Sequence, residues 1–123
     1  MITINDKISK NGFSVLYSNN NWKVAFITFA EQYGKMKVVK RHNLTDEIFV
    51  LIKGKATLFT SDEKIPNNFT ITELQLQKLY NVIKGTWHHL TISDDALLVV
   101  VENSNTSNEN TDIFHLDKIV DLQ

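Results

Sequence analysis

The chain contains no cysteine, so disulfide bonds and thiolate metal sites are excluded. Its single proline, Pro66, lies in a polar stretch that we interpret as a loop. No apolar run approaches the length of a membrane span, and residues 1–10 lack the apolar core of a signal peptide. These absences lead us to expect a cytoplasmic protein that has no membrane partner.

Charge of either sign is not concentrated in long runs. The chain has 13 Lys and Arg and 14 Asp and Glu, for a formal net charge of −1. The basic residues are scattered apart from Lys35, Lys37, Lys40 and Arg41, which alternate with apolar residues as in a strand. This pattern is not the footprint of a nucleic-acid binder, so we expect no nucleic-acid partner.

Short β-like runs dominate the sequence. The length of 123 residues predicts one domain, residues 1–123, with its core between about residues 22 and 116. Strands are expected at residues 13–17, 22–29, 35–42, 47–52, 56–60, 69–73, 80–83, 87–92, 96–102 and 113–116. Residues 61–68 and 103–110 are predicted loops, and Asp117 is expected to cap a helical turn over residues 117–123. Many short strands without a strong helix predict an all-β sandwich or barrel.

Two of these strands are almost entirely apolar. Residues 47–52 are rich in β-branched and aromatic side chains, which predicts burial on both faces, and residues 96–101 belong to the clearest buried strand of the sequence. This is more buried surface than one small sandwich needs. We therefore expect a homodimer, formed by packing sheets or by exchanging edge strands.

Strand alternation sorts the residues that could carry chemistry. His42 shares a face with Lys40, and the turn after it lets Glu47 converge on it from the next strand. His88 shares a face with apolar residues and should point inward, whereas His89 should point outward with Trp87. A carboxylate and two imidazoles on inward faces need a partner there. The interpretations are a divalent metal with N and O ligands, a buried polar network, or residues at a rim without a role.

Two segments resemble the cupin superfamily, in its small, single-domain, cupin_2-like form. His42, Glu47 and Gly54 match the spacing of the first cupin motif, and residues 85–88 (Gly-Thr-Trp-His) resemble the end of the second. The resemblance extends over about residues 36–102, more than half of the chain. It implies a double-stranded β-helix, or jelly-roll barrel.

The resemblance also implies a site. Carried over by position, the metal ligands are His42, Glu47 and His88, and the metal is Fe, Mn, Zn or Ni. The sequence departs from the family pattern at three positions: Lys40, Ile83 and Ile92. Lys40 stands where the first histidine is usual. Its ammonium would repel a dication and would pair well with Glu47, so Lys40 and Glu47 are the candidate catalytic residues.

Three functions are compatible with these residues. The first is a metal-dependent enzyme acting on a small polar or carboxylate-bearing metabolite, with Lys40 orienting an anionic substrate. The second is a metal-free module that binds a sugar or metabolite. The candidate ligand-binding residues are Lys40, His42, Trp87 and Glu102, although Trp87 also suits a core or interface and Glu102 also suits the end of a strand. The third rests on residues 41–49 and 81–89, which are similar to stretches of the ureidoglycolate lyase family.

Overall fold

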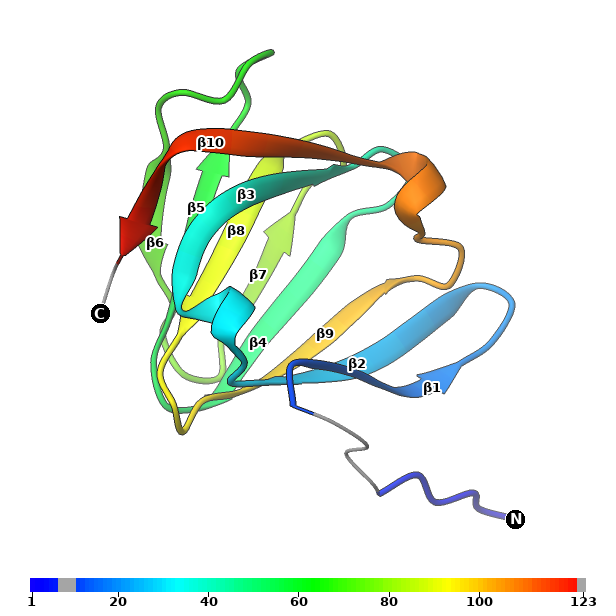
Figure 1. Ribbon diagram of the computed structural model, residues 1–123. Helices are drawn as coiled ribbons and strands as arrows, with labels where there is room; N and C mark the ends of the chain where they lie inside the picture. The colour runs from blue at the N-terminus through cyan, green and yellow to red at the C-terminus, as the bar shows by residue number, and fades with distance from the viewer. Residues whose placement is uncertain (7–10, 122–123) are drawn as a thin grey trace.

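The computed structural model describes residues 1–6 and 11–121, and the side chains of these residues up to position 117. Its strands form two five-stranded antiparallel sheets that face each other as two layers (Figure 1). The first sheet has the order β1-β2-β9-β4-β7 and comprises β1 (Phe13–Ser18), β2 (Trp22–Thr28), β9 (Leu97–Asn103), β4 (Glu47–Lys53) and β7 (Leu79–Val82). The second has the order β10-β3-β8-β5-β6 and comprises β10 (Thr111–Asp121), β3 (Lys35–His42), β8 (Trp87–Ile92), β5 (Ala56–Ser61) and β6 (Thr70–Glu73).

The connections give the layers a jelly-roll topology. From β6 onward, consecutive strands alternate between the second and the first sheet, as in a double-sheet jelly roll. Two short 3₁₀ helices, η1 (Glu31–Tyr33) and η2 (Asn108–Asn110), precede β3 and β10. The all-β jelly-roll fold expected from the sequence is therefore confirmed. Among the described residues, no helix has the length and apolar character needed to span a membrane.

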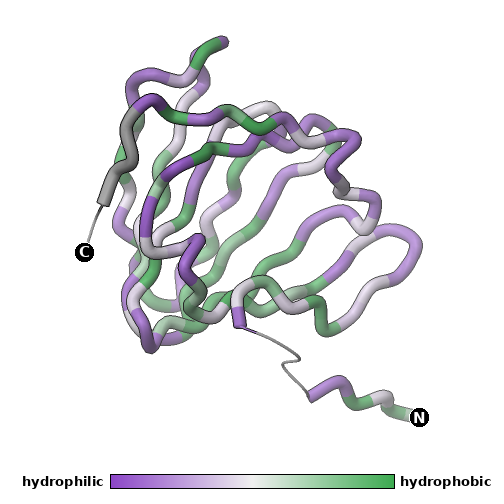
Figure 2. Tube along the Cα trace, viewed as in Figure 1, coloured by the Kyte–Doolittle hydropathy of each residue, from purple (hydrophilic) through white to green (hydrophobic). Residues whose placement is uncertain are grey.

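The main core lies between the two sheets. Hydrophobic and hydrophilic positions alternate along the strands (Figure 2), which turns one row of each strand inward. The buried inward residues are Ala25, Ile27, Phe49, Leu51, Ala56, Leu58, Leu74, Val82, Leu90, Ile92, Ala96, Leu98 and Val100. They fill the closed part of the barrel and leave polar residues at the end where β3 ends and β4 begins.

A second cluster covers the outer face of the second sheet. Met36, Val39, Phe59 and Trp87 are buried there, and Arg41 lies 4.4 Å above the Trp87 ring in a cation–π contact. Met36 and Val39 lie in the same cluster although strict alternation would separate them. The pairing of β3 with β10 is interrupted at this point, since Val38 pairs with His115 but Met36 pairs with Val120. The alternation of β3 therefore slips by one residue near Lys37.

Two expectations from the sequence are wrong in detail. The helical turn expected from Asp117 is absent, because residues 117–121 continue β10 as a strand; residues 122–123 lie outside the described part. The strand at residues 47–52 is not buried on both faces, since its outward residues Ile48 and Val50 are half-buried and Ile52 is 45% exposed. Long-range pairing with β3 decides the first case. In the second, the outward side chains of β4 lie on the outer face of the sheet, which is only partly covered in the described part of the structure.

Candidate functional site

Two turns bring His42, Glu47 and His88 to one end of the barrel. The turn at residues 43–46 carries the chain from β3 in the second sheet to β4 in the first. Asp46 in this turn accepts hydrogen bonds from the Lys84 backbone N–H (2.9 Å) and the Asn81 side chain (3.1 Å), and the Gly85 N–H donates to the His42 carbonyl (2.8 Å). The segment that leads into His88 is thus tied to the segment between His42 and Glu47.

The side chains of these three residues converge on one carboxylate oxygen. Glu47 Oε1 lies 2.9 Å from His88 Nε2 and 3.3 Å from His42 Nε2. The other ring nitrogens are held from behind, with His88 Nδ1 3.1 Å from the Thr86 carbonyl and His42 Nδ1 2.8 Å from Thr111 Oγ1. Both imidazoles therefore present Nε2 to the site in a fixed orientation.

The protonation of His88 and Glu47 can be inferred from these contacts. The Thr86 carbonyl only accepts, so His88 Nδ1 carries a hydrogen, and Nε2 faces a carboxylate that also accepts when ionised. Burial alone would raise the pKa of Glu47, but hydrogen bonds from His42 and His88 and their charges outweigh it and lower the pKa to about 2. Burial alone would lower the pKa of His88, but its contacts with Glu47 outweigh it and raise that pKa. Both pKa shifts favour an imidazolium next to a carboxylate.

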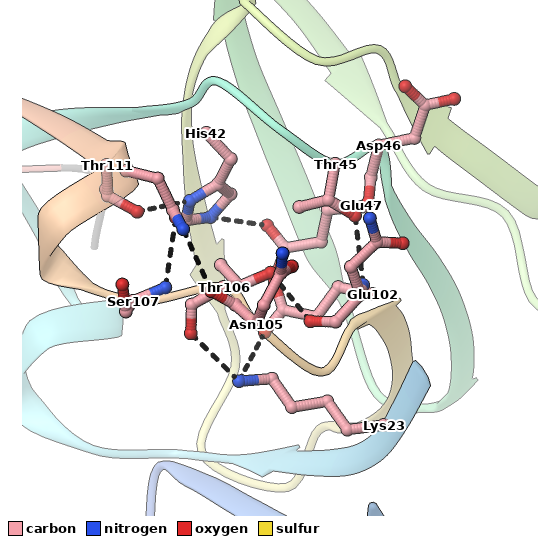
Figure 3. A network of polar contacts seen from close by, with 12 residues as sticks. Lys23, His42, Thr45, Asp46, Glu47, Glu102, Asn105, Thr106, Ser107 and Thr111 are labelled. Carbon is pink, nitrogen blue, oxygen red and sulfur yellow. Dashed lines mark hydrogen bonds and ion pairs between the residues drawn. The ribbon is translucent and has the colours of Figure 1, made fainter. Parts of the chain in front are cut away.

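A second carboxylate lies beside the first. Glu102 on β9 is the direct cross-strand partner of Glu47 and is 7% exposed. Burial, followed by the charge of Glu47, raises the pKa of Glu102 to about 7. Lys23 on β2 pairs with Glu102 Oε1 at 3.6 Å and also reaches the Thr106 carbonyl at 3.4 Å (Figure 3). Lys23, Glu102 and Glu47 thus form a row across three adjacent strands of the first sheet.

A pocket of about 920 Å³ opens above this row. Its floor includes Lys23, His42, Glu47, His88 and Glu102, and β3, η1 and the loop before β10 form its walls. The pocket is large enough for a small metabolite.

Only some of the residues predicted from the sequence lie at the site. Lys40 lines the pocket, but its side chain is exposed, and the ion pairs of Glu47 in the described chain are with His42 and His88. The expected Lys40–Glu47 pair is therefore wrong. Glu102 points into the site, whereas Trp87 lies in the outer cluster and does not line the pocket.

His89 has the outward placement expected from alternation. It pairs across the strands with Phe59, which belongs to the outer cluster, and it is half-buried. Burial, followed by the nearby charge of His88, lowers the pKa of His89 to about 4. His89 also lines the pocket, but it is not part of the His42, Glu47 and His88 cluster at the floor.

Three residues of the site escaped prediction: Lys23 lines the pocket, Thr111 orients His42, and Asp46 ties the two turns together. Tyr33, just before β3, also lines the pocket. The signal for Lys23 was available, because it alternates with the buried residues of β2 and is the charged member of that inward row. Burial raises the pKa of the Tyr33 hydroxyl, so it stays a neutral donor at the pocket wall.

The donor set fits a transition-metal ion. One nitrogen from each histidine and one Glu47 oxygen all lie within 4.8 Å of one another. Neighbouring ligands on an octahedral or tetrahedral ion with bonds of about 2.0–2.1 Å are about 2.9–3.4 Å apart. The two His–Glu47 separations of 2.9 and 3.3 Å fall in this range. Two imidazoles and one carboxylate suit Fe, Mn, Zn or Ni.

Comparison with known proteins gives matches in structure rather than in sequence. No family model and no curated protein sequence matches the chain. A cupin-2 domain protein from Shewanella frigidimarina is 18% identical with a TM-score of 0.59, covering 78% of this chain and 84% of its own. The nucleoside dehydratase Pac13 of Streptomyces is 9% identical with a TM-score of 0.67, covering 90% and 85%.

A third solved structure is a variant of the QdtA 3,4-ketoisomerase from Thermoanaerobacterium thermosaccharolyticum in complex with TDP. It is 16% identical with a TM-score of 0.59, covering 72% of this chain and 63% of its own. Variants of Pac13 have been solved with uridine. At these identities the likeness shows the fold, and that fold is the cupin barrel.

Proposed function

We propose that this cupin-fold chain is a small enzyme that binds a divalent transition metal through His42, Glu47 and His88 and acts on a small polar metabolite in the adjoining pocket. The observation that carries the proposal is the convergence of two oriented Nε2 atoms on one buried carboxylate at the floor of the pocket. Burying ionisable groups costs folding free energy even when they are paired, and such clusters with perturbed pKa values occur preferentially at functional sites.

The chain's own residues have distinct roles in this proposal. When bound, the metal supplies Lewis-acid or redox chemistry. Thr86 and Thr111 hold the two imidazoles in position, so that the donor set is preorganised. Glu102, with Lys23 as its counter-ion, accepts a hydrogen bond or a proton from the substrate at the pocket floor. Two of the structural neighbours are enzymes, a nucleoside dehydratase and a ketoisomerase, which supports catalysis as the use of this pocket.

The test is metal content measured by mass spectrometry on untagged protein that has been purified without chelator. We expect about one equivalent of a transition metal in the wild type and its loss in His88→Ala, because the site then keeps only two ligands. His115→Ala is the matched control, since His115 is exposed on β10 away from the pocket. Binding should also release protons, because the metal takes the position of the proton on His88 Nε2. A wild type that stays metal-free after incubation with Mn, Fe, Ni and Zn would contradict the proposal.

A second function, metal-free binding or acid–base catalysis, is favoured by one observation. Glu47 and His88 already neutralise each other through a hydrogen bond of 2.9 Å, so the floor is complete without an ion. Uridine and TDP are suitable first probes, because neighbours of the same fold hold them. Tight binding of either by chelator-treated protein, without any metal requirement, would favour this function over the first. The resemblance to ureidoglycolate lyase stays a prediction, to be tested by assay of that reaction.

A further inference from the structure

The wall of the pocket above the floor carries positive charge on one strand. Lys35, Lys37 and Lys40 are all exposed, all lie on β3 and all line the pocket. Within the described part of the chain, Lys37 and Lys40 have no carboxylate within ion-pair distance. Their charge is therefore available to a ligand.

The irregularity in β3 is what gathers these lysines. Strict alternation would place Lys35 and Lys37 on the outer face, opposite Lys40. The slip near Lys37 instead puts Met36 and Val39 in the outer cluster, while both Lys37 and its neighbour Val38 line the pocket. A regular strand would have left one lysine at the pocket where this strand places three.

The remaining groups of the pocket do not cancel this charge. The floor carboxylates have their own partners, since Glu47 contacts the two histidines and Glu102 pairs with Lys23. Apart from Glu31, the residues contributed by η1 and by the loop before β10 are uncharged: Gln32, Tyr33, Thr106, Ser107 and Asn108. The pocket is thus electrostatically divided, with a neutralised floor and a positive wall.

We propose that Lys35, Lys37 and Lys40 form an anion subsite, which binds a phosphate or carboxylate group of the substrate while its uncharged polar part reaches the floor. The inference rests on the proposed function in taking this pocket as the substrate site. Exposed ammonium groups are mobile point charges that suit an anion of either shape, and a charged wall beside a cleft also raises the rate of anion entry. The substrate class is a small anionic metabolite.

The test is calorimetric titration at constant ionic strength with two probes, inorganic phosphate and malonate. We compare the wild type with the triple variant K35Q/K37Q/K40Q. Each exposed ion pair contributes up to about fivefold in affinity, so the triple variant should bind about tenfold more weakly. The matched control K53Q/K55Q/K78Q makes the same change in net charge at exposed lysines outside the pocket and should bind like the wild type.

Each outcome bears on the subsite. Tighter binding of phosphate assigns phosphorylated substrates to it, and tighter binding of malonate assigns carboxylates. Equal affinity in the wild type and K35Q/K37Q/K40Q, an equal loss in the control, or no binding of either anion to the wild type would overturn the inference. Metal content measured on the same preparations separates the two proposals. A metal-free wild type that still binds phosphate through these lysines would contradict the metal centre and leave the anion subsite standing.

Discussion

At the scale of the residue, the pKa values of two neighbouring carboxyl groups in one barrel are shifted in opposite directions. Glu47 faces two imidazoles, which lower its pKa to about 2, whereas burial and the charge of Glu47 raise the pKa of Glu102 to about 7. Two negative charges on adjacent strands are unfavourable at this depth, so Glu47 ionises easily and Glu102 ionises only near neutral pH. In the proposed function, this division suits Glu47 to metal binding and Glu102 to proton exchange.

The raised pKa of Glu102 predicts a loss of stability with rising pH. In the unfolded chain this group ionises near its ordinary value of 4.5, but in the fold it ionises near 7. The folded state therefore binds more protons between these values, and its stability falls as the pH rises from about 4.5 to 7. We expect Glu102→Gln to remove a loss of about 1–3 kcal/mol between pH 5 and pH 8.

The measurement is urea unfolding of chelator-treated wild type and Glu102→Gln at both pH values. Asp94→Asn is the control, because Asp94 is an exposed carboxylate in the turn before β9. Its difference between pH 5 and pH 8 should match that of the wild type. Parallel stability curves for the wild type and Glu102→Gln would show that Glu102 ionises normally.

At the scale of the element, the β4–β5 turn requires glycine for two reasons. Gly54 has φ +79°, in the left-handed region that side chains disfavour. A Cβ at this position would lie 2.6 Å from Ala96 Cα and 2.9 Å from Ala96 N, both backbone atoms. The turn packs directly against the start of β9. Glycine is therefore needed at position 54 both for its backbone conformation and because there is no room for a side chain.

Gly54→Ala should therefore destabilise the fold by about 2–4 kcal/mol, as the sum of conformational strain and overpacking. Gly85→Ala separates the two causes. Gly85 has φ +83°, but a Cβ added there would meet nothing within 4 Å beyond its chain neighbours, so only the strain of about 1–2 kcal/mol is expected. Thermal and urea unfolding of both variants measures the difference, and equal losses would show that the contact with Ala96 is absorbed by relaxation.

Much of the site was predictable because it follows from the spacing of residues along the sequence. The rest depends on which strands pair with each other and in which register. His42, Glu47 and His88 came from the distance to a turn and from alternation within one strand. Glu102 entered the site because β9 pairs with β4 in the register that sets it opposite Glu47. Lys35, Lys37 and Lys40 line the pocket together because the alternation of β3 slips by one residue, which the local sequence pattern does not predict.

At the scale of the whole molecule, the outer face of the first sheet is apolar and only partly covered. Its central rows hold half-buried Val24, Phe26, Ile48, Val50, Val99 and Val101, with Ile52 exposed at 45%. A continuous apolar face of this kind is a typical interaction surface. We propose that it packs against the same face of a second copy, which would bury the outward rows of β4 and β9.

Val99→Lys places a charge near the centre of this face, next to Val50 on β4 and Phe26 on β2. Light scattering coupled to size exclusion should give twice the monomer mass for the wild type and the monomer mass for the variant. Lys64→Ala, at an exposed position of the loop between β5 and β6, should leave the mass unchanged. A wild type that elutes at monomer mass would exclude the dimer.

The site also joins the two layers of the barrel. His42 and His88 belong to the second sheet, while Glu47 and Glu102 belong to the first. A ligand bound between these residues contacts both sheets, so the sheets cannot separate until the ligand is released. By mass action, such a ligand raises the free energy of unfolding by an amount that grows with its concentration relative to its dissociation constant. The melting temperature of this small barrel therefore reports the occupancy of the site. A compound that binds between the two sheets will raise it.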